Sequence, residues 1–449
     1  MNVPVLRDKN CAVVGLARTG SAVVRFCLAR GAKVTALERS SETIARVAET
    51  ALRDAGAEVI LGPEADRLPD GIDLVIPSPG VPPAAPILRA SGVRGIPIMS
   101  EMELAARFTD RPIIAVTGTN GKTTTVTLIG DLLVAAGFEP EVAGNIGRPL
   151  IEFVDGPARG PLVVEASSFQ LEYTSEFSPR VAVLLNITPD HLNWHDDMDS
   201  YRRAKMRLFA AQEPDDWAVV PAGLLSDLSA LAARTVVLGG PEGVLIENGW
   251  ICQGLTGARR RVVEVGRIPL PGAHNIENIM AATAAVLAFE VAPEVIAEVV
   301  YGFGGVEHRL EFVAEEGGVR YYNDSKATNP VSSIKALEAF DADIVLLAGG
   351  RNKGNDFTEL AGAAARRTRF VILFGEAASE IGEALAALQV PYVTVATLQE
   401  AVEAGRCRAR PGEVVLLSPA CASFDMFADY EERGGRFKRL VIEKVESFG

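Results

Sequence analysis

The feature that most restricts the fold of this chain is an apolar segment, PIIAVTG (112–118), that runs into a glycine-rich turn and then into a helical pattern (125–137). A buried strand, a tight turn and a helix in this order form the βα unit of a parallel sheet. Backbone N–H groups of such a turn, together with the positive end of the helix, can bind phosphate. The stretch therefore predicts a loop that binds the phosphates of ATP. The loop residues are Gly118, Thr119, Asn120, Gly121, Lys122, Thr123 and Thr124.

Two side chains of this loop suit a nucleotide. Lys122 would neutralise the β and γ phosphates, and Thr123 would offer a hydroxyl to Mg²⁺. The usual spacing is G-x-x-x-x-G-K-[ST], but Val116 occupies the place of its first glycine, so the loop is a shorter relative of that motif. The alternative is a glycine-rich turn with a solvated lysine. The loop by itself leaves kinase, ATPase and ligase open.

The length of 449 residues exceeds what one hydrophobic core supports, so two or three domains are expected. The first hundred residues alternate apolar strands with helices, one of them from about residue 21 to 30. The pattern starts again after the polar, glycine-rich segment FGGVEHR (303–309). We predict an α/β protein of three domains: a Rossmann-like N-terminal domain (1–100), a central P-loop-type ATPase domain (101–305) and a Rossmann-like C-terminal domain (306–449).

Charge and composition exclude several classes of protein. The formal net charge of −14 would repel nucleic acid. The three consecutive arginines at 259–261 are the one basic cluster in the sequence that departs from this acidic balance. The five cysteines form no CxxC pair, which indicates reduced thiols in the cytoplasm. No apolar run reaches the ~20 residues of a membrane span, so we expect no membrane insertion.

Two polar residues follow buried strands of the central domain. Glu165 ends the strand PLVVE, and His191 follows VAVLLNI, so both are expected at the sheet edge where α/β proteins bind ligands. Mg²⁺ coordination is our interpretation of Glu165, against an acid that caps a helix. A lone histidine is often structural. His195 is four residues further on, but no helical face aligns the two histidines, and we treat it as background.

Lys205 lies on the apolar stripe of a predicted helix, with Tyr201, Leu208 and Phe209 at spacings of three and four. It is therefore predicted to point inward. The alternative is snorkelling, in which the stem packs and the ammonium group reaches water.

The first domain also contains a partial dinucleotide motif. CAVVGLARTG is followed by Glu38 near the end of the second strand, but Ala17 takes the place of the middle glycine. A methyl group there hinders the approach of a pyrophosphate to the backbone. The motif therefore argues less strongly for an NAD-dependent dehydrogenase, although it does not exclude one.

Motifs along nearly the whole chain resemble those of the Mur ligases. They are TGTNGKTT, EASSFQLE, the DH of ITPDHLN, YRRAKMRLF, GAHNIENIMAA, HRLEF, NDSKATN and LSPACASFDMF. The last two look like those of the members that add D-glutamate, rather than L-alanine, a diamino acid or a dipeptide. The resemblance implies domains for the UDP-sugar, ATP and the incoming amino acid, in that order.

The resemblance also implies the catalytic and metal residues. Lys122, His191 and Lys205 would be catalytic. Thr123 and Glu165 would attend one Mg²⁺, while His191 and Lys205 would hold a second. The lysine matching Lys205 is carbamylated in this family, and a carbamate can bind Mg²⁺ whereas an ammonium group would be repelled.

The remaining site residues follow from the same resemblance. The UDP-linked substrate would contact Arg18, Thr19, Glu38, Ser78, Gly80, Asn145, Ser167 and Gln170. ATP would contact, besides the loop, Asn275, Asn278, Arg309 and Asp324. D-Glutamate would contact Lys326, Thr328, Lys353, Ser423, Phe424 and Tyr430, where phenylalanine would be expected at the last position.

The implied reaction joins D-glutamate to UDP-N-acetylmuramoyl-L-alanine through an acyl phosphate, in peptidoglycan precursor synthesis, by a monomeric enzyme. Three alternatives stay open: the dehydrogenase, a nucleotide switch without chemistry, and folylpolyglutamate synthetase as a rival within the ligases.

Overall fold

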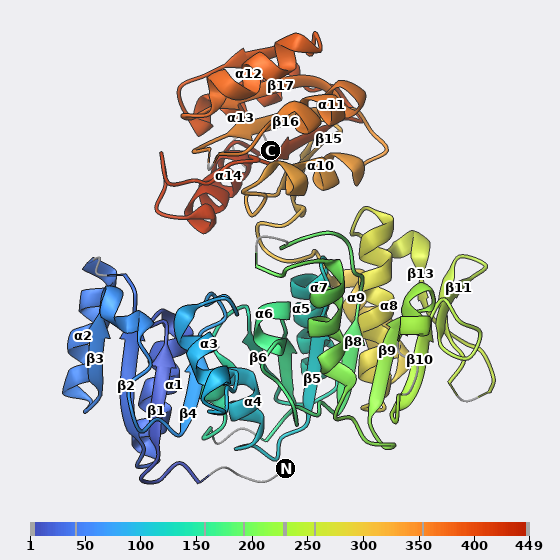
Figure 1. Ribbon diagram of the computed structural model, residues 1–449. Coiled ribbons are helices and arrows are strands. Elements are labelled where there is room, and N and C mark those ends of the chain that lie inside the picture. The colour runs from blue at the N-terminus through green and yellow to red at the C-terminus, as the bar shows by residue number, and fades with distance from the viewer. Residues whose placement is uncertain are drawn as a thin grey trace. The chain divides into compact units, whose positions relative to one another are not determined.

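The computed structural model describes residues 5–40, 43–156, 159–191, 194–227, 231–255, 257–352 and 354–445. The chain forms two compact units (Figure 1). The first consists of Met1–Arg267 with Glu277–Tyr301, and the second of Ile268–Ile276 with Gly302–Gly449. Each unit is described by itself below.

The first sheet has four parallel strands in the order β3-β2-β1-β4. Helix α1 begins at residue 18, three residues before the predicted start, because Ala17 is already its extended N-cap. The elements are β1 (Asn10–Val14), α1 (Arg18–Ala29), β2 (Lys33–Glu38), α2 (Thr43–Asp54), β3 (Glu58–Leu61), the 3₁₀ helix η1 (Pro63–Asp66), β4 (Leu74–Pro77) and α3 (Pro86–Val93).

The second sheet has nine strands in the order β13-β12-β11-β10-β9-β8-β5-β7-β6. Strands β5 to β11 pair in parallel, and β12 and β13 add an antiparallel edge. The elements up to η3 are α4 (Glu101–Ala106), β5 (Ile113–Thr117), α5 (Lys122–Ala135), β6 (Glu141–Gly144), η2 (Leu150–Phe153), β7 (Leu162–Glu165), α6 (Ser168–Leu171), β8 (Val181–Leu184), α7 (Met198–Met206) and η3 (Arg207–Phe209). They are followed by β9 (Trp217–Pro221), η4 (Ala222–Asp227), β10 (Arg234–Leu238), β11 (Val244–Glu247), β12 (Trp250–Gln253), β13 (Arg260–Glu264), η5 (Val265–Arg267), α8 (Ala273–Leu287) and α9 (Pro293–Gly302).

The third sheet lies in the second unit and has the order β14-β15-β19-β16-β17-β18. All its pairs are parallel except β14 with β15. The elements are β14 (Glu311–Glu316), β15 (Val319–Asn323), α10 (Pro330–Glu338), β16 (Ile344–Gly349), α11 (Thr358–Arg367), β17 (Thr368–Phe374), α12 (Ala378–Ala387), β18 (Tyr392–Thr394), α13 (Leu398–Arg408), β19 (Val414–Leu417) and α14 (Tyr430–Val445).

Side chains of the third sheet alternate between two apolar cores. Leu346 packs with α10, α11 and α12 on one face, and Leu347 packs with α13 and α14 on the other. This is the expected result when successive residues of a fully buried strand point to opposite sides. The predicted α/β class with parallel sheets is confirmed.

The first and second sheets share one continuous core, which explains why they form a single compact unit. At their junction, the rings of Phe26 and Phe108 meet edge to face at 5.1 Å. The guanidinium group of Arg30 lies 3.4 Å from the centroid of the Phe26 ring and forms an ion pair with Asp155 at 2.6 Å.

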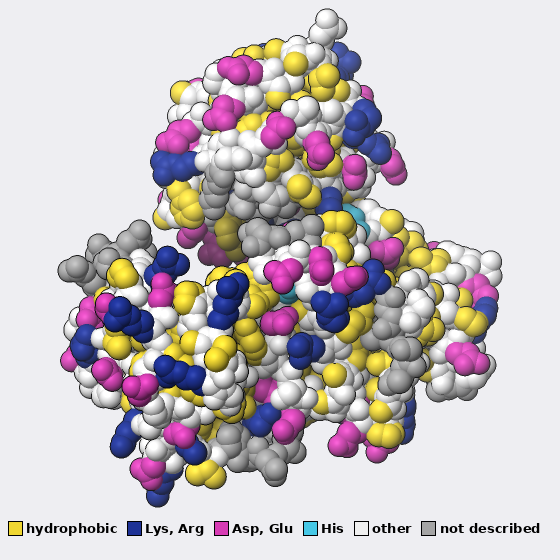
Figure 2. Space-filling view, in the orientation of Figure 1, with side chains coloured by type: hydrophobic (Ala, Val, Ile, Leu, Met, Phe, Trp, Pro, Cys, Tyr) yellow, Lys and Arg dark blue, Asp and Glu magenta, His cyan; other side chains and the backbone are white. Residues whose placement is uncertain are grey.

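Charged side chains of both signs are mixed on the face of each unit seen in Figure 2. Among the described helices, none has both the length and the apolar character needed to cross a bilayer.

Candidate active site

The predicted phosphate loop leaves β5 between the neighbouring strands β7 and β8 and leads into α5. Gly121 caps α5 with a φ of 87°, and a Cβ atom there would lie 2.1 Å from Oδ1 of Asn278, so any other residue would strain the backbone and displace the Asn278 side chain. The Asn120 backbone N–H donates to Asn186 Oδ1 at 2.9 Å, and Asn186 Nδ2 donates to the Asn120 carbonyl at 3.1 Å. Contacts from other elements thus hold the loop in shape. Asn186 was missed from the sequence, although it follows the same strand as His191.

Lys122 folds back over this loop. Its Nζ donates to the carbonyl groups of Gly118 at 2.8 Å and Thr119 at 3.0 Å. The side chain is half-buried, unlike the solvated lysine considered as the alternative. Its ammonium group therefore lies at the loop backbone, where it can attract phosphate oxygens.

Glu165 ends β7 and is 2% exposed. One carboxylate oxygen accepts from the Thr123 hydroxyl at 2.8 Å, and the other accepts from Asn145 Nδ2 at 2.8 Å. The helix cap considered as the alternative is wrong, because Ser167 caps the next helix, α6, in a capping box with Gln170. The three predicted residues Thr123, Asn145 and Glu165 form one hydrogen-bonded group beside the loop.

The Lys205 side chain points inward from α7 and is 1% exposed. Its Nζ donates to the Gly118 carbonyl at 2.9 Å and lies 4.6 Å from the centroid of the Tyr201 ring. Burial, followed by repulsion from Lys122, lowers the pKa of Lys205 to about 6. Snorkelling is thus wrong, since the amine reaches the phosphate loop and not water.

His191 and His195 belong to an aromatic cluster with Phe169. Burial and the cationic lysines nearby lower the pKa of His191, whose backbone has a φ of 55°. His195 is buried, and its Nε2 lies 2.9 Å from Ser168 Oγ. Burial, followed by Lys205, lowers its pKa to about 4. His195 is thus part of the site's wall, which its spacing in the sequence did not indicate.

One compact group of potential metal-binding side chains occurs in the part of the chain that the structure describes, and it lies elsewhere. It consists of Glu307, His308 and Glu311 in the second unit. Lys438 Nζ donates to Glu307 at 2.9 Å and to Glu311 at 2.5 Å, so an ammonium group already neutralises these carboxylates. The group is accounted for as a structural ion-pair network.

The predicted UDP-substrate residues of the first sheet gather at its carboxyl edge. Glu38 accepts from the backbone N–H groups of Leu16 and Ser40, and the Ser78 hydroxyl donates to the Gly15 carbonyl. Arg18 and Thr19 begin α1, Glu38 ends β2, and Ser78 and Gly80 follow β4. This edge is where open α/β sheets bind ligands.

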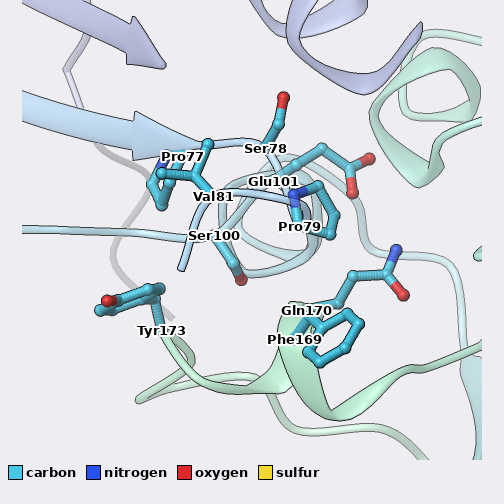
Figure 3. A pocket seen from close by; sticks show the side chains of 9 residues that line it. All are labelled: Pro77, Ser78, Pro79, Val81, Ser100, Glu101, Phe169, Gln170 and Tyr173. Carbon is cyan, nitrogen blue, oxygen red and sulfur yellow. The ribbon is translucent and has the colours of Figure 1, made fainter. Parts of the chain in front are cut away.

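A small pocket joins this edge to α6 (Figure 3). It is lined by Pro77, Ser78, Pro79, Val81, Ser100, Glu101, Phe169, Gln170 and Tyr173 and has room for about one water molecule (≈ 10 Å³). Glu101 Oε1 accepts from the Ile151 N–H at 2.7 Å, whereas no described residue hydrogen-bonds to its Oε2. Burial raises the pKa of Glu101 to about 7. No signal in the sequence marked Glu101 as buried, because the acid opens a helix as solvated acids commonly do.

The other predicted residues belong mainly to the second unit. Asp324 is buried, and burial raises its pKa to about 7. Lys326 Nζ lies 5.8 Å from the centroid of the Tyr430 ring. Asn275, Arg309, Asp324, Lys326, Thr328, Ser423, Phe424 and Tyr430 lie in this unit, and Asn278 lies in the first. Lys353 lies outside the described residues.

Three family models match successive parts of the chain. They are described as the Mur ligase MurD-like N-terminal domain (residues 9–100), the Mur ligase middle domain (116–286) and the Mur ligase glutamate ligase domain (308–421).

Relatives of known name match over nearly the full length. The UDP-N-acetylmuramoylalanine–D-glutamate ligase of Pelotomaculum thermopropionicum is 45% identical and that of Geobacter metallireducens 44%. The alignments cover 97% of this chain and 97% and 98% of the relatives. Among solved structures, the MurF ligase of Thermotoga maritima in complex with ADP is similar with a TM-score of 0.58 at 15% identity, covering 99% of this chain and 96% of that one. At that identity the likeness shows the fold alone.

Proposed function

Because this chain belongs to the Mur ligase family, we propose that it is the ATP-dependent, ADP-forming ligase that adds D-glutamate to UDP-N-acetylmuramoyl-L-alanine. The relatives that carry this name support the substrates. One observation of the structure carries the proposal: the buried Lys205 amine is hydrogen-bonded to the carbonyl of the phosphate-loop residue Gly118. A nucleotide switch or a dehydrogenase has no use for a buried lysine there.

The reaction proceeds in two steps. The carboxylate of the L-alanyl group attacks the γ phosphate of ATP, which forms an acyl phosphate and releases ADP. The D-glutamate amine then attacks the acyl carbon, the C–O bond to phosphate breaks, and the ammonium proton is lost to solvent. The protein contributes positioning and charge, with Lys122 and the loop N–H groups facing the transferred phosphate.

The oxygen donors beside the loop fit Mg²⁺. The Thr123 hydroxyl and the Glu165 carboxylate already meet at 2.8 Å, and both are ligand types that Mg²⁺ prefers. We assign one ion to these two residues and a second to His191 and Lys205. Bound Mg²⁺ would neutralise the phosphate oxygens and the substrate carboxylate.

We infer that Lys205 acts as a carbamate. An ammonium group would repel a nearby cation, whereas the neutral amine adds to CO₂, loses a proton and becomes a carboxylate. Its burial beside the loop supports this chemistry, because burial favours the neutral amine.

The substrates are assigned by domain, with boundaries at 1–100, 101–305 and 306–449. The carboxyl edge of the first sheet, with Asn145, Ser167 and Gln170, would bind the UDP-linked substrate. The phosphate loop, Asn275, Asn278, Arg309 and Asp324 would bind ATP, and Lys326, Thr328, Lys353, Ser423, Phe424 and Tyr430 would bind D-glutamate. We further infer a monomer that works in cytoplasmic peptidoglycan precursor synthesis.

Phosphate release tests this function. With UDP-N-acetylmuramoyl-L-alanine and ATP, D-glutamate should support turnover, while L-glutamate, L-alanine and a diamino acid should not. Turnover with L-glutamate on a folate substrate would favour folylpolyglutamate synthetase. ADP release without an amino acid would favour a switch, and absorbance change of a nicotinamide cofactor would favour a dehydrogenase.

A further inference from the structure

Arg433 on α14 is a fully buried arginine in the second unit. Its Nη1 and Nη2 each donate to the Cys421 carbonyl at 3.2 Å. Nη2 also donates to the Ser325 carbonyl at 2.9 Å, and Nε donates to the Ser325 hydroxyl at 3.0 Å. One guanidinium group therefore holds two segments that are about a hundred residues apart in sequence.

The charge of Arg433 has no carboxylate partner within ion-pair distance among the described residues. Asp425 and Asp324 attract it from further away, and burial lowers its pKa to about 10, so it remains charged at neutral pH. Buried charges are usually paired, because removing an ion from water is unfavourable. A neutral side chain could also hydrogen-bond two loops together. The charge that Arg433 retains therefore calls for a separate explanation.

The position of Arg433 supplies that explanation. Ser325 follows β15, Cys421 follows β19, and both strands end at the same edge of the third sheet. The loop after the neighbouring strand β16 is equally close, since a Cβ atom on Gly350 would lie 3.1 Å from Arg433 Nη1. The guanidinium group therefore lies where three parallel strands end, which is the place where such sheets bind ligands.

We propose that Arg433 is a positioning residue for the dicarboxylic amino acid, which rests on the proposed function. Its hydrogen bonds fix the position of segment 325–328 relative to segment 421–424. These segments carry four residues predicted to bind D-glutamate: Lys326, Thr328, Ser423 and Phe424. No described carboxylate lies within ion-pair distance of the Arg433 charge, which adds a positive potential beneath these segments that favours an anionic ligand. An amide at this position would keep a hydrogen bond to one segment. It would lose both the positive charge and the ability of the guanidinium group to donate to two segments at once.

Steady-state kinetics of Arg433→Gln and Arg433→Lys test the proposal. In Arg433→Gln, the KM for D-glutamate should rise roughly 10- to 100-fold, the range expected for hydrogen bonds made by a charged group. The KM values for ATP and the UDP-linked substrate should stay within about twofold. The preference for D-glutamate over the neutral D-glutamine should fall in Arg433→Gln and be largely kept in Arg433→Lys, which retains the charge.

Arg406→Gln is the matched control. Arg406 is a largely buried arginine of the same unit, but it pairs with Glu316 at the opposite edge of the third sheet, where β15 begins. Its replacement should reduce stability without changing the KM for D-glutamate selectively. Circular dichroism would confirm that each variant is folded, and Arg433→Lys carries the test if Arg433→Gln is not.

Two outcomes would overturn the role of Arg433: an unchanged KM for D-glutamate in both variants, or an equal change in the KM of all three substrates. Wild-type protein that releases no phosphate with D-glutamate would instead overturn the proposed function. The wild-type assay therefore separates the two failures.

Discussion

Replacing Lys205 by methionine should stabilise the protein while it abolishes turnover. At pH 7.5 the amine is protonated in the unfolded chain, where its pKa is 10.5, but largely neutral in the folded protein, where the pKa is about 6. Releasing this proton over three pH units costs about 4 kcal/mol of folding free energy. Methionine has a similar length and no charge, so it removes this cost.

The net gain should be smaller than the full 4 kcal/mol. The hydrogen bond from Lys205 to the Gly118 carbonyl is lost, worth about 1 kcal/mol. That carbonyl is not left without a partner, because Lys122 also donates to it at 2.8 Å. We therefore expect Lys205→Met to raise the free energy of unfolding by about 3 kcal/mol.

The sign of the pH dependence follows from the lowered pKa. Between about pH 6 and 10.5 the unfolded chain binds more protons than the folded one at Lys205, so the wild-type protein gains stability as the pH rises. The variant lacks this group, so its advantage in stability should fall to about zero near pH 10, where the remaining cost of deprotonation, about 1 kcal/mol, is offset by the lost hydrogen bond. Below about pH 6 the advantage should be constant.

Urea unfolding followed by tryptophan fluorescence measures this effect in the relevant unit. Trp194, Trp217 and Trp250 are the three tryptophans of the chain, and all lie in the first unit with Lys205. CO₂-free buffer without nucleotide keeps the amine unmodified. Lys33→Met, at an exposed position of β2, is the control and should change stability by less than about 0.5 kcal/mol. An advantage that is absent, or constant between pH 7 and 10, would refute the reasoning.

Four further predictions concern single side chains. Lys205→Ala should lose nearly all activity and regain part of it with formate or acetate, and full activity without them would contradict a carbamate. Glu165→Gln keeps the contact to Thr123 but loses the negative charge, so it should raise the Mg²⁺ concentration for half-maximal activity at least about tenfold. An unchanged Mg²⁺ titration would show that Glu165 does not bind the metal. Gly121→Ala should abolish nucleotide binding in equilibrium dialysis, because its Cβ meets Asn278, and retained binding would mean that the loop can shift. The buried Glu103 accepts hydrogen bonds from Arg107 and from the backbone N–H groups of residues 175–177. Glu103→Gln should therefore lower the free energy of unfolding by about 3 kcal/mol in the same urea assay. A loss under about 1 kcal/mol would show that this network is dispensable for stability.

The features that the sequence determined are local ones. The order strand, glycine-rich turn and helix places Lys122 and Thr123 at the start of α5 whatever surrounds them, since neighbours in sequence remain neighbours in space. Helical periodicity was likewise enough to turn Lys205 inward, and the ends of parallel strands were enough to bring Glu165 beside the loop. The resemblance of the motifs added the family, which the comparisons bear out.

Only the tertiary structure decided which polar groups are buried and what they touch. Asn278 meets Gly121 across more than 150 residues, Arg433 joins Ser325 to Cys421, and Glu101 reaches Ile151 from another element. Such contacts depend on how helices and strands pack, and no periodicity within one segment encodes them. The same holds for the two compact units, because the shared core that joins the first two sheets is built from residues scattered over more than two hundred positions.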